Sequence, residues 1–436
     1  MQRRGPGHRL LPMLCVGLAV LVATGPAAVA TRRPAALDRA GPAHDHQHAA
    51  DTADTAAGRS RASAADLAVR LQALLGQHSI LAADLMRSRI RGDDSFVQAA
   101  NAALGENTEA MTDLVGQLFG PATGRRFGPM WSQHVVSLVT YAAAVADQDA
   151  GALTRARREL VEYEEQLADF FAGGSHGRLS RPAARAAILM HVDHLTRQAD
   201  AYAAGDHATA DRLYRQSYQH TYDLGLTLAE ALLPAADRAT LRQPIWRLRS
   251  QLGKLLAEHA ALVEDVTRAA ETGGPDFDAA AEMINGNTRD VAAAVDTLFG
   301  AAAARRFQAL WASHVEQIVA YAGATAAGRN DRKERARASL RDFERGLAAV
   351  LAPATGGRMT PAALSAALTE HDRMLLRHAD LYAAKDYQGA QEVAGRTYQH
   401  MFDLARRLAD GFGAEVASRL PRGGPETGQG GLAGPR

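Results

Sequence analysis

The chain repeats itself. The segment LFGPATGRRFGPMWSQHVVSLVTYAAA, which begins at Leu118, aligns without a gap with LFGAAAARRFQALWASHVEQIVAYAGA, which begins at Leu298. The same offset joins YQHTYDLGLTLA, from Tyr218, to YQHMFDLARRLA, from Tyr398. Further upstream the offset is one residue longer, which indicates one insertion or deletion in a loop. Because a long internal repeat means the same structural unit twice, the sequence predicts two homologous domains in tandem.

Apolar residues in each copy recur every three or four positions. One such series in the first copy is Leu71, Leu74, His78, Leu81 and Leu85. This spacing places the side chains on one face of an α-helix, and no stretch alternates over a useful length as a half-buried strand does. The sequence therefore predicts an all-α protein of two tandem homologous helical-bundle domains. About seven helices are expected in each copy, five of them long.

Residues that favour helix ends predict some of the boundaries. Asn107 and Asn287 are expected to cap the start of a short helix in each copy. Glycine commonly follows the last turn of a helix, and serine or threonine commonly precedes the first. The remaining boundary signals are Gly120, Gly300, Ser180 and Thr360.

The two ends and the junction differ in composition from the repeats. An apolar run from Leu10 to Val22 follows a basic start and precedes Ala28-Val29-Ala30, which is typical of a signal peptide. Segments poor in large apolar residues are predicted to be disordered, because they bury too little surface to offset the entropy of ordering. The predicted segments are a signal peptide (1–30), a disordered His-containing leader (31–63), helical-bundle repeat 1 (64–234), a linker (235–244), helical-bundle repeat 2 (245–412) and a disordered tail (413–436).

The signal peptide predicts that the protein is secreted or otherwise extracytoplasmic. No later segment approaches the roughly 20 apolar residues of a transmembrane anchor. The formal net charge of +1 gives no reason to expect nucleic acid as a partner, whereas a protein partner in the cell envelope is compatible with a tandem bundle. The single cysteine, Cys15, lies in the signal peptide, so disulfides and thiolate ligands are not expected in the exported chain.

Each copy carries a histidine on the apolar face of four different helices, where leucine is the more usual residue. Four imidazoles that point toward one bundle axis could converge. The candidate site residues are His78, His134, His191 and His220 in the first copy and His259, His314, His371 and His400 in the second. A separate short tract in the leader could bind divalent ions weakly or be only a solvated tail; it comprises His44, His46 and His48.

Three interpretations of the eight candidate histidines remain open. In the first, each imidazole is buried and neutral, and it exchanges hydrogen bonds with tyrosine, asparagine or a backbone carbonyl, which fixes the helix register. In the second, the imidazoles bind a transition metal. A cysteine-free, histidine-rich set suits Cu(II), Zn or Ni better than Ca or Mg. In the third, two histidines on facing helices ligate a haem. Of the two bound groups, haem is less favoured than a transition-metal ion.

The sequence lacks the motifs of common hydrolases and metalloenzymes. His-Glu-x-x-His, Gly-x-Ser-x-Gly and phosphate-loop motifs are absent, and the aligned positions contain no Glu-x-x-His pair. An enzyme that uses the histidines as general bases is therefore the least supported function. The predicted function is an exported soluble binding protein of the cell envelope or extracellular space, and the most specific hypothesis places a metal ion in each His-lined bundle. The alternative is a structural or partner-binding repeat protein whose core histidines bind no ligand.

One extended motif carries a resemblance. Trp-x-x-His is followed seven residues later by Tyr in both copies, at Trp131 to Tyr141 and at Trp311 to Tyr321. AYAAGD or LYAAKD and then Tyr-x-His come after it. With these motifs, the chain resembles uncharacterised, exported helical tandem-repeat proteins of high-GC bacteria over nearly all of both copies. The resemblance implies a helical fold and export from a bacterial cell, and it supplies no activity to carry over.

Overall fold

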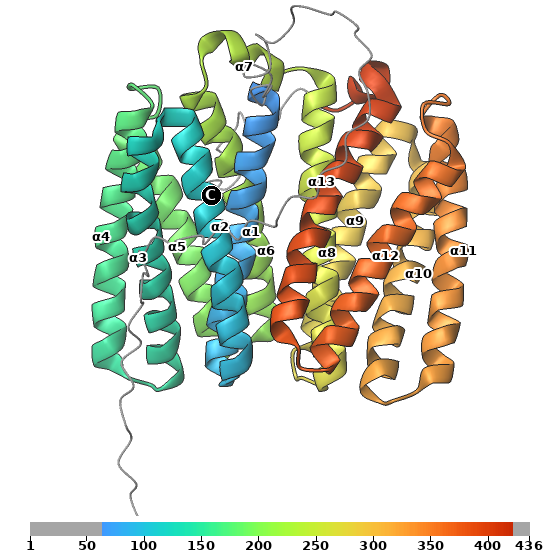
Figure 1. Cartoon of the computed structure of the whole chain (residues 1–436), viewed down its shortest axis with the longest axis horizontal. Helices are drawn as coiled ribbons and strands as arrows, with labels where there is room; N and C mark the ends of the chain where they lie inside the picture. Colours follow the sequence, from blue (N-terminus) through green and yellow to red (C-terminus); the bar gives the residue numbers. More distant parts are fainter. Residues whose placement is uncertain (1–62, 422–436) are drawn as a thin grey trace, which may run out of the picture. The chain divides into compact units, whose positions relative to one another are not determined.

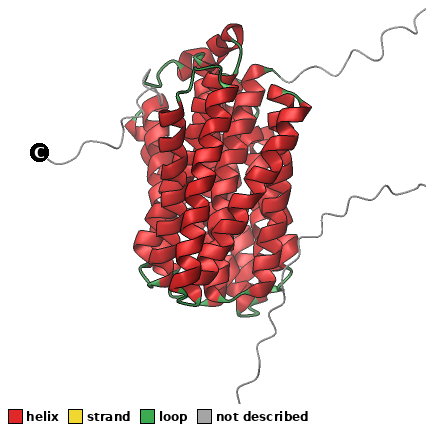
Figure 2. Ribbon diagram, turned by 90° about the vertical axis from the view of Figure 1, so that its left-hand side faces the viewer, coloured by secondary structure: helices red, strands yellow, loops and turns green. Residues whose placement is uncertain are grey.

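The computed structural model describes residues 63–421, and the observations below concern this range. The predicted signal peptide, the histidine tract of the leader and the end of the tail lie outside the described residues. The described chain consists of helices and short loops without a strand, so the prediction of an all-α fold is confirmed. The helices run alongside one another and most loops lie at their ends (Figure 2). None of these helices combines the length and the apolar character needed to cross a membrane.

Each repeat contains six long helices within the described range, rather than the five expected (Figure 1). The first repeat comprises α1 (Ala64–Arg91), α2 (Asp94–Phe119), α3 (Pro121–Ala146), α4 (Ala150–Gly174), α5 (Arg181–Ala203) and α6 (His207–Leu232). The second comprises α8 (Pro244–Thr272), α9 (Phe277–Phe299), α10 (Ala301–Ala326), α11 (Asn330–Ala354), α12 (Pro361–Ala383) and α13 (Tyr387–Ala417).

Asn107 and Asn287 do not cap helices, so that prediction is wrong. Both are buried in the middle of a long helix, α2 or α9. Each donates from its side-chain amide to a backbone carbonyl of the preceding helix, 3.0 Å away: Asn107 to Leu74 and Asn287 to Leu255. Because the neighbouring helix satisfies the amide, the asparagine can lie inside the helix. The other signals are confirmed: helices end at Gly120 and Gly300 and are capped by Ser180 and Thr360.

The junction and the C-terminal end contain more helix than the sequence predicts. The predicted linker includes a short helix, α7 (Ala235–Leu241), and α8 begins at Pro244. The tail predicted from residue 413 is wrong for its first residues, because α13 continues to Ala417 across a kink at Gly413, whose φ is 80°. Ala417 and Leu420 are buried, and their apolar contacts stabilise this continuation of α13. The glycines in this part of the sequence led to the prediction of a disordered tail.

The repeats contact each other through the first, second and last long helices of each repeat. Tyr218 of α6 donates to the carbonyl of Lys254 at 2.9 Å, and Tyr398 of α13 donates to the carbonyl of Ala73 at 3.0 Å. The two tyrosines are equivalent in the repeat, and so are the two carbonyls that accept. Such reciprocal contacts are expected of two like halves related by an approximate twofold axis. The division of the chain into two domains stays a prediction.

Gly225 lets α6 approach α1 closely. A Cβ atom added at Gly225 would lie 2.6 Å from the Cα atom of Gln72, a backbone atom that cannot rotate away. We expect Gly225→Ala to push the helices apart and to lower the free energy of unfolding by about 1–3 kcal/mol. Chemical denaturation followed by circular dichroism measures the change. Gly105→Ala is the control because its added Cβ meets no atom within 4 Å; equal stabilities of the two variants would contradict the prediction.

Charged side chains are buried where the repeats meet. Arg87 of α1 forms an ion pair with Asp211 at 2.8 Å and lies 3.8 Å from Asp265 of the other repeat. Asp84, one turn before Arg87, is also in this region. Burial and, to a lesser extent, the nearby charge of Asp265 together raise the pKa of Asp84 to about 7, against the opposing effect of Arg87. The contact between repeats is therefore sensitive to the ionisation of this carboxyl group.

Asp84→Asn is expected to stabilise the protein in a pH-dependent way. Because the pKa of Asp84 is raised from 3.8 to about 7, the folded state retains a proton that the unfolded state releases, and stability is lost as the pH rises through this window. Asparagine has no ionisable carboxyl group, so the variant does not lose stability from this position as the pH rises. The gain in unfolding free energy should be small at about pH 4 and up to about 4 kcal/mol at about pH 8, since one pKa unit corresponds to about 1.4 kcal/mol.

The measurement is denaturation of both proteins at the two pH values. Asp94→Asn, at a highly exposed carboxylate, serves as the control. A gain of the same size at both pH values would show that the effect does not come from the raised pKa.

Candidate functional site

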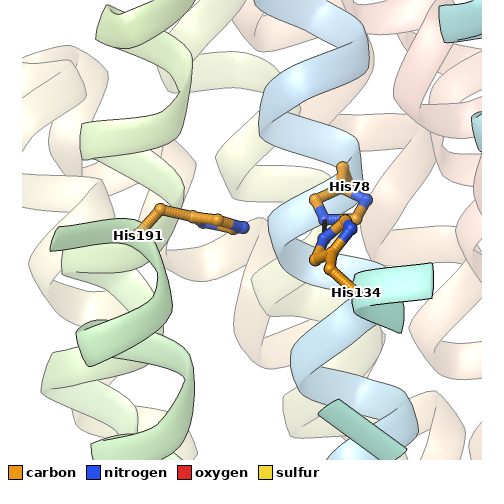
Figure 3. Close-up of side chains that lie close together, drawn as sticks. All are labelled: His78, His134 and His191. Atoms are coloured by element: carbon orange, nitrogen blue, oxygen red, sulfur yellow. Dashed lines mark hydrogen bonds between the residues drawn. The ribbon is translucent and has the colours of Figure 1, made fainter. Parts of the chain in front are cut away.

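Three of the four candidate histidines in the first repeat come together. His78 of α1, His134 of α3 and His191 of α5 each present a ring nitrogen, and these three nitrogens lie within 4.8 Å of one another. His191 points from α5 toward the pair formed by His78 and His134 (Figure 3). The side chains are at most 3% exposed. His78, His134 and His191 form the first triad.

The second repeat has the equivalent arrangement. His259 of α8, His314 of α10 and His371 of α12 again place one ring nitrogen each within 4.8 Å of the others. All three are buried, with at most 1% of their surface exposed. This second triad shows that the convergence belongs to the repeated unit and not to one local packing accident.

His220 and His400 are not members of the triads. Nε2 of His220 donates to the carbonyl of Ala187 at 2.8 Å, and Nε2 of His400 lies 3.2 Å from the carbonyl of Ala367. Both side chains are partly exposed. These bonds tie α6 to α5 and α13 to α12, so the structure gives the two histidines a role in helix contact. The predicted four-histidine sets therefore contain three converging imidazoles each.

Contacts within α3 and α10 fix the tautomer of one histidine in each triad. Nδ1 of His134 lies 2.5 Å from the carbonyl of Trp131, and Nδ1 of His314 lies 3.1 Å from the carbonyl of Trp311. A carbonyl only accepts, so Nδ1 carries the proton and Nε2 keeps a free lone pair. In the first triad this Nε2 is 2.9 Å from Nε2 of His78, which must then be the donor. Metal-ligating histidines are commonly oriented by such a bond from the other ring nitrogen.

Aromatic side chains pack directly against the imidazoles. In the first triad the ring of Tyr163 stacks on His134, with centroids 4.3 Å apart, and the ring of Trp131 lies 4.6 Å from His78. The second triad has the equivalent contacts at 4.4 and 4.5 Å: Phe343 with His314, and Trp311 with His259. These rings cover the faces of the imidazoles and so help to fix the direction in which the ring nitrogens point.

Burial keeps all six imidazoles neutral at physiological pH. Burial lowers the pKa of His134 to about 3 and that of His314 to about 4. It also lowers the pKa of the other four well below the usual value, and neighbouring imidazoles lower them further: His78, His191, His259 and His371. Neutral imidazole is the form that ligates a metal ion, so protons compete little with a metal at these sites near neutral pH.

The two triads differ in how well their nitrogens are hydrogen-bonded. In the first, His78 and His134 bond to each other. In the second, neither ring nitrogen of His371 has a hydrogen-bond partner among the described residues, and neither has Nε2 of His314. A buried polar group without a partner costs about 1–3 kcal/mol. A network of hydrogen bonds alone therefore does not explain the second triad.

Asp372 is a site residue that the sequence analysis missed. Its Oδ1 lies 3.5 Å from Nε2 of His314, and the side chain is buried. Burial raises the pKa of Asp372 well above the usual value, and the neighbouring carboxyl group of Glu344 raises it further. The aligned residue in the first repeat is Val192. An aspartate at a position where the other copy has valine was the available signal.

Comparison of the chain with known protein families, with curated proteins and with solved structures gives no match. The function therefore has to be inferred from the chemistry of the two triads.

Proposed function

We propose that the protein is an exported binding protein that holds one transition-metal ion in each histidine triad. The observation that carries the proposal is the convergence of three buried imidazoles at the same place in both repeats. Three histidines are a known ligand set for zinc, with a fourth position left for another ligand. The signal-peptide pattern in residues 1–30 supports a role outside the cytoplasm.

The spacing of the nitrogens supports a shared ion. Zn–N bonds are about 2.0–2.1 Å long, so two nitrogens on one tetrahedral zinc ion lie about 3.4 Å apart. The nitrogens of each triad lie within 4.8 Å of one another. Closure thus needs side-chain movements on the order of 1 Å, for which small rotations of the imidazoles suffice. Nitrogen ligands without sulfur favour Zn, Cu(II) or Ni.

The unpartnered nitrogens also support a bound ion. A metal would occupy the lone pair of Nε2 of His314 and one nitrogen of His371, both of which lack a hydrogen-bond partner among the described residues. Coordination bonds would then offset the free-energy cost of burying these nitrogen atoms. Because the imidazoles are already neutral, binding needs no loss of charge from the ligands.

A structural or partner-binding repeat protein is the second candidate. It is favoured by the first triad, where His134 bonds to His78 at 2.9 Å and to the carbonyl of Trp131 at 2.5 Å. Such a buried network can fix the register of helices without a ligand. It explains the second triad less well, because neither ring nitrogen of His371 has a hydrogen-bond partner within residues 63–421.

Metal uptake by the purified full chain tests the proposal. Zinc sulfate, copper sulfate and nickel sulfate are added separately, and bound metal is measured by elemental analysis after dialysis. We expect two equivalents of at least one of these ions per chain. A His44→Ala/His46→Ala/His48→Ala variant removes the leader tract and should keep both equivalents. A folded chain that retains none of the three ions would refute the proposal and favour the structural alternative.

A further inference from the structure

We infer that the two metal sites are chemically different: the second uses Asp372 as a fourth, oxygen ligand and binds a divalent ion more tightly than the first. The inference rests on the proposed function. It concerns a position beside the triads where the two repeats differ in charge, since Asp372 aligns with Val192.

The position of Asp372 is already close to that of a ligand. Its Oδ1 lies 3.5 Å from Nε2 of His314, whose other nitrogen is held by the carbonyl of Trp311. Two ligand atoms on one tetrahedral zinc ion are about 3.3–3.4 Å apart, so this pair has nearly the required spacing. Asp372 lies outside the group of nitrogens within 4.8 Å of one another. The side chain would have to rotate to bring a carboxylate oxygen onto an ion held by the three imidazoles.

Among the described residues, Asp372 is buried with no cation in contact with it. The residue is 2% exposed, and its carboxyl group has a hydrogen-bond contact with another carboxyl group, that of Glu344. It also lies 3.5 Å from Nε2 of His314, whose buried imidazole is neutral. Burying two carboxyl groups together without a positive charge is costly. A divalent ion bound by the second triad would supply the missing positive charge.

The first triad has no such group. Within residues 63–421, no carboxylate makes an ion-pair contact with His78, His134 or His191, and the aligned Val192 is apolar. Three neutral imidazoles leave both charges of a divalent ion uncompensated in a buried site. One carboxylate halves the net charge of the site. In a medium of low dielectric constant this lowers the electrostatic free energy of the bound ion by a large amount. The second site should therefore hold zinc more tightly than the first.

Zinc affinities of chains with a single site test the inference. His134→Leu leaves only the second site and His314→Leu leaves only the first. Competition with a fluorescent zinc chelator at one fixed pH gives both dissociation constants. We expect the second site to be at least about tenfold tighter, and Asp372→Val in the His134→Leu chain to weaken it by about 10–100-fold. Asp372→Asn is the nearly isosteric alternative, and circular dichroism checks that each variant is folded.

The structure offers a matched control and a converse variant. Glu370→Gln changes a carboxylate on the same helix that pairs with Arg373, and it should leave the zinc affinity unchanged. Val192→Asp in the His314→Leu chain should tighten the first site. Equal affinities of the two single-site chains, unaffected by Asp372→Val, would overturn the inference and leave the proposed function standing. If neither single-site chain nor the unsubstituted chain binds metal, the proposed function itself fails.

Discussion

His134→Leu and His314→Leu are each expected to reduce the metal content of the protein by one ion per chain, and the double variant is expected to bind none in its core. Each substitution removes an Nε2 lone pair that a backbone carbonyl holds ready through Nδ1. Two remaining imidazoles hold a divalent ion much less tightly than three. Leucine has a similar volume and no polar atom, so it fits the buried position. At His134 the substitution also removes the acceptor of the Nε2–H group of His78, which adds a cost in stability.

Elemental analysis of dialysed protein measures the ions per chain, and circular dichroism confirms the helical fold. His220→Leu is the matched control, because His220 is an inward histidine of the same repeat that bonds to Ala187 and lies outside the triad. It should leave the metal content unchanged. Retention of both ions by the double variant would mean that the metal is bound somewhere other than at the triads.

Removal of metal is expected to cause a large loss of stability. An ion that binds only the folded state stabilises it by about 4 kcal/mol when free metal exceeds the dissociation constant a thousandfold. Two sites give about twice this value. The thermal midpoint should therefore fall after treatment with a chelator and recover when zinc is added.

The His134→Leu/His314→Leu chain provides the control for this effect. It should melt at the same temperature with and without zinc, because neither triad can form a complete site. A zinc-dependent shift of similar size in this variant would show that the stabilisation comes from other groups on the protein.

Much of the helical architecture could be predicted from the sequence, because apolar spacing and end signals are local properties. Gly120 and Ser180 mark boundaries that the structure confirms. Asn107 does not cap a helix, because its side-chain amide bonds to the carbonyl of Leu74 on another helix. Whether an asparagine caps its own helix or bonds to a neighbour depends on tertiary packing, which local sequence does not specify.

The candidate site could be predicted in part. Helical periodicity indicates which way a side chain points around the helix, and that was sufficient to select His78, His134 and His191. It does not fix the height of a residue along the bundle relative to residues on other helices. For this reason His220, which also faces inward, was grouped with a triad that it does not join. Asp372 was missed because it follows His371 directly, and adjacent residues on a helix do not share a face.

Coordination of the ion by three imidazoles is tested most directly by X-ray absorption at the zinc K edge of the zinc-loaded full chain. We predict a first shell of nitrogen and oxygen at about 2.0 Å, with the outer-shell scattering of about three imidazole rings per zinc ion. A first shell of oxygen without imidazole scattering would contradict binding at the triads.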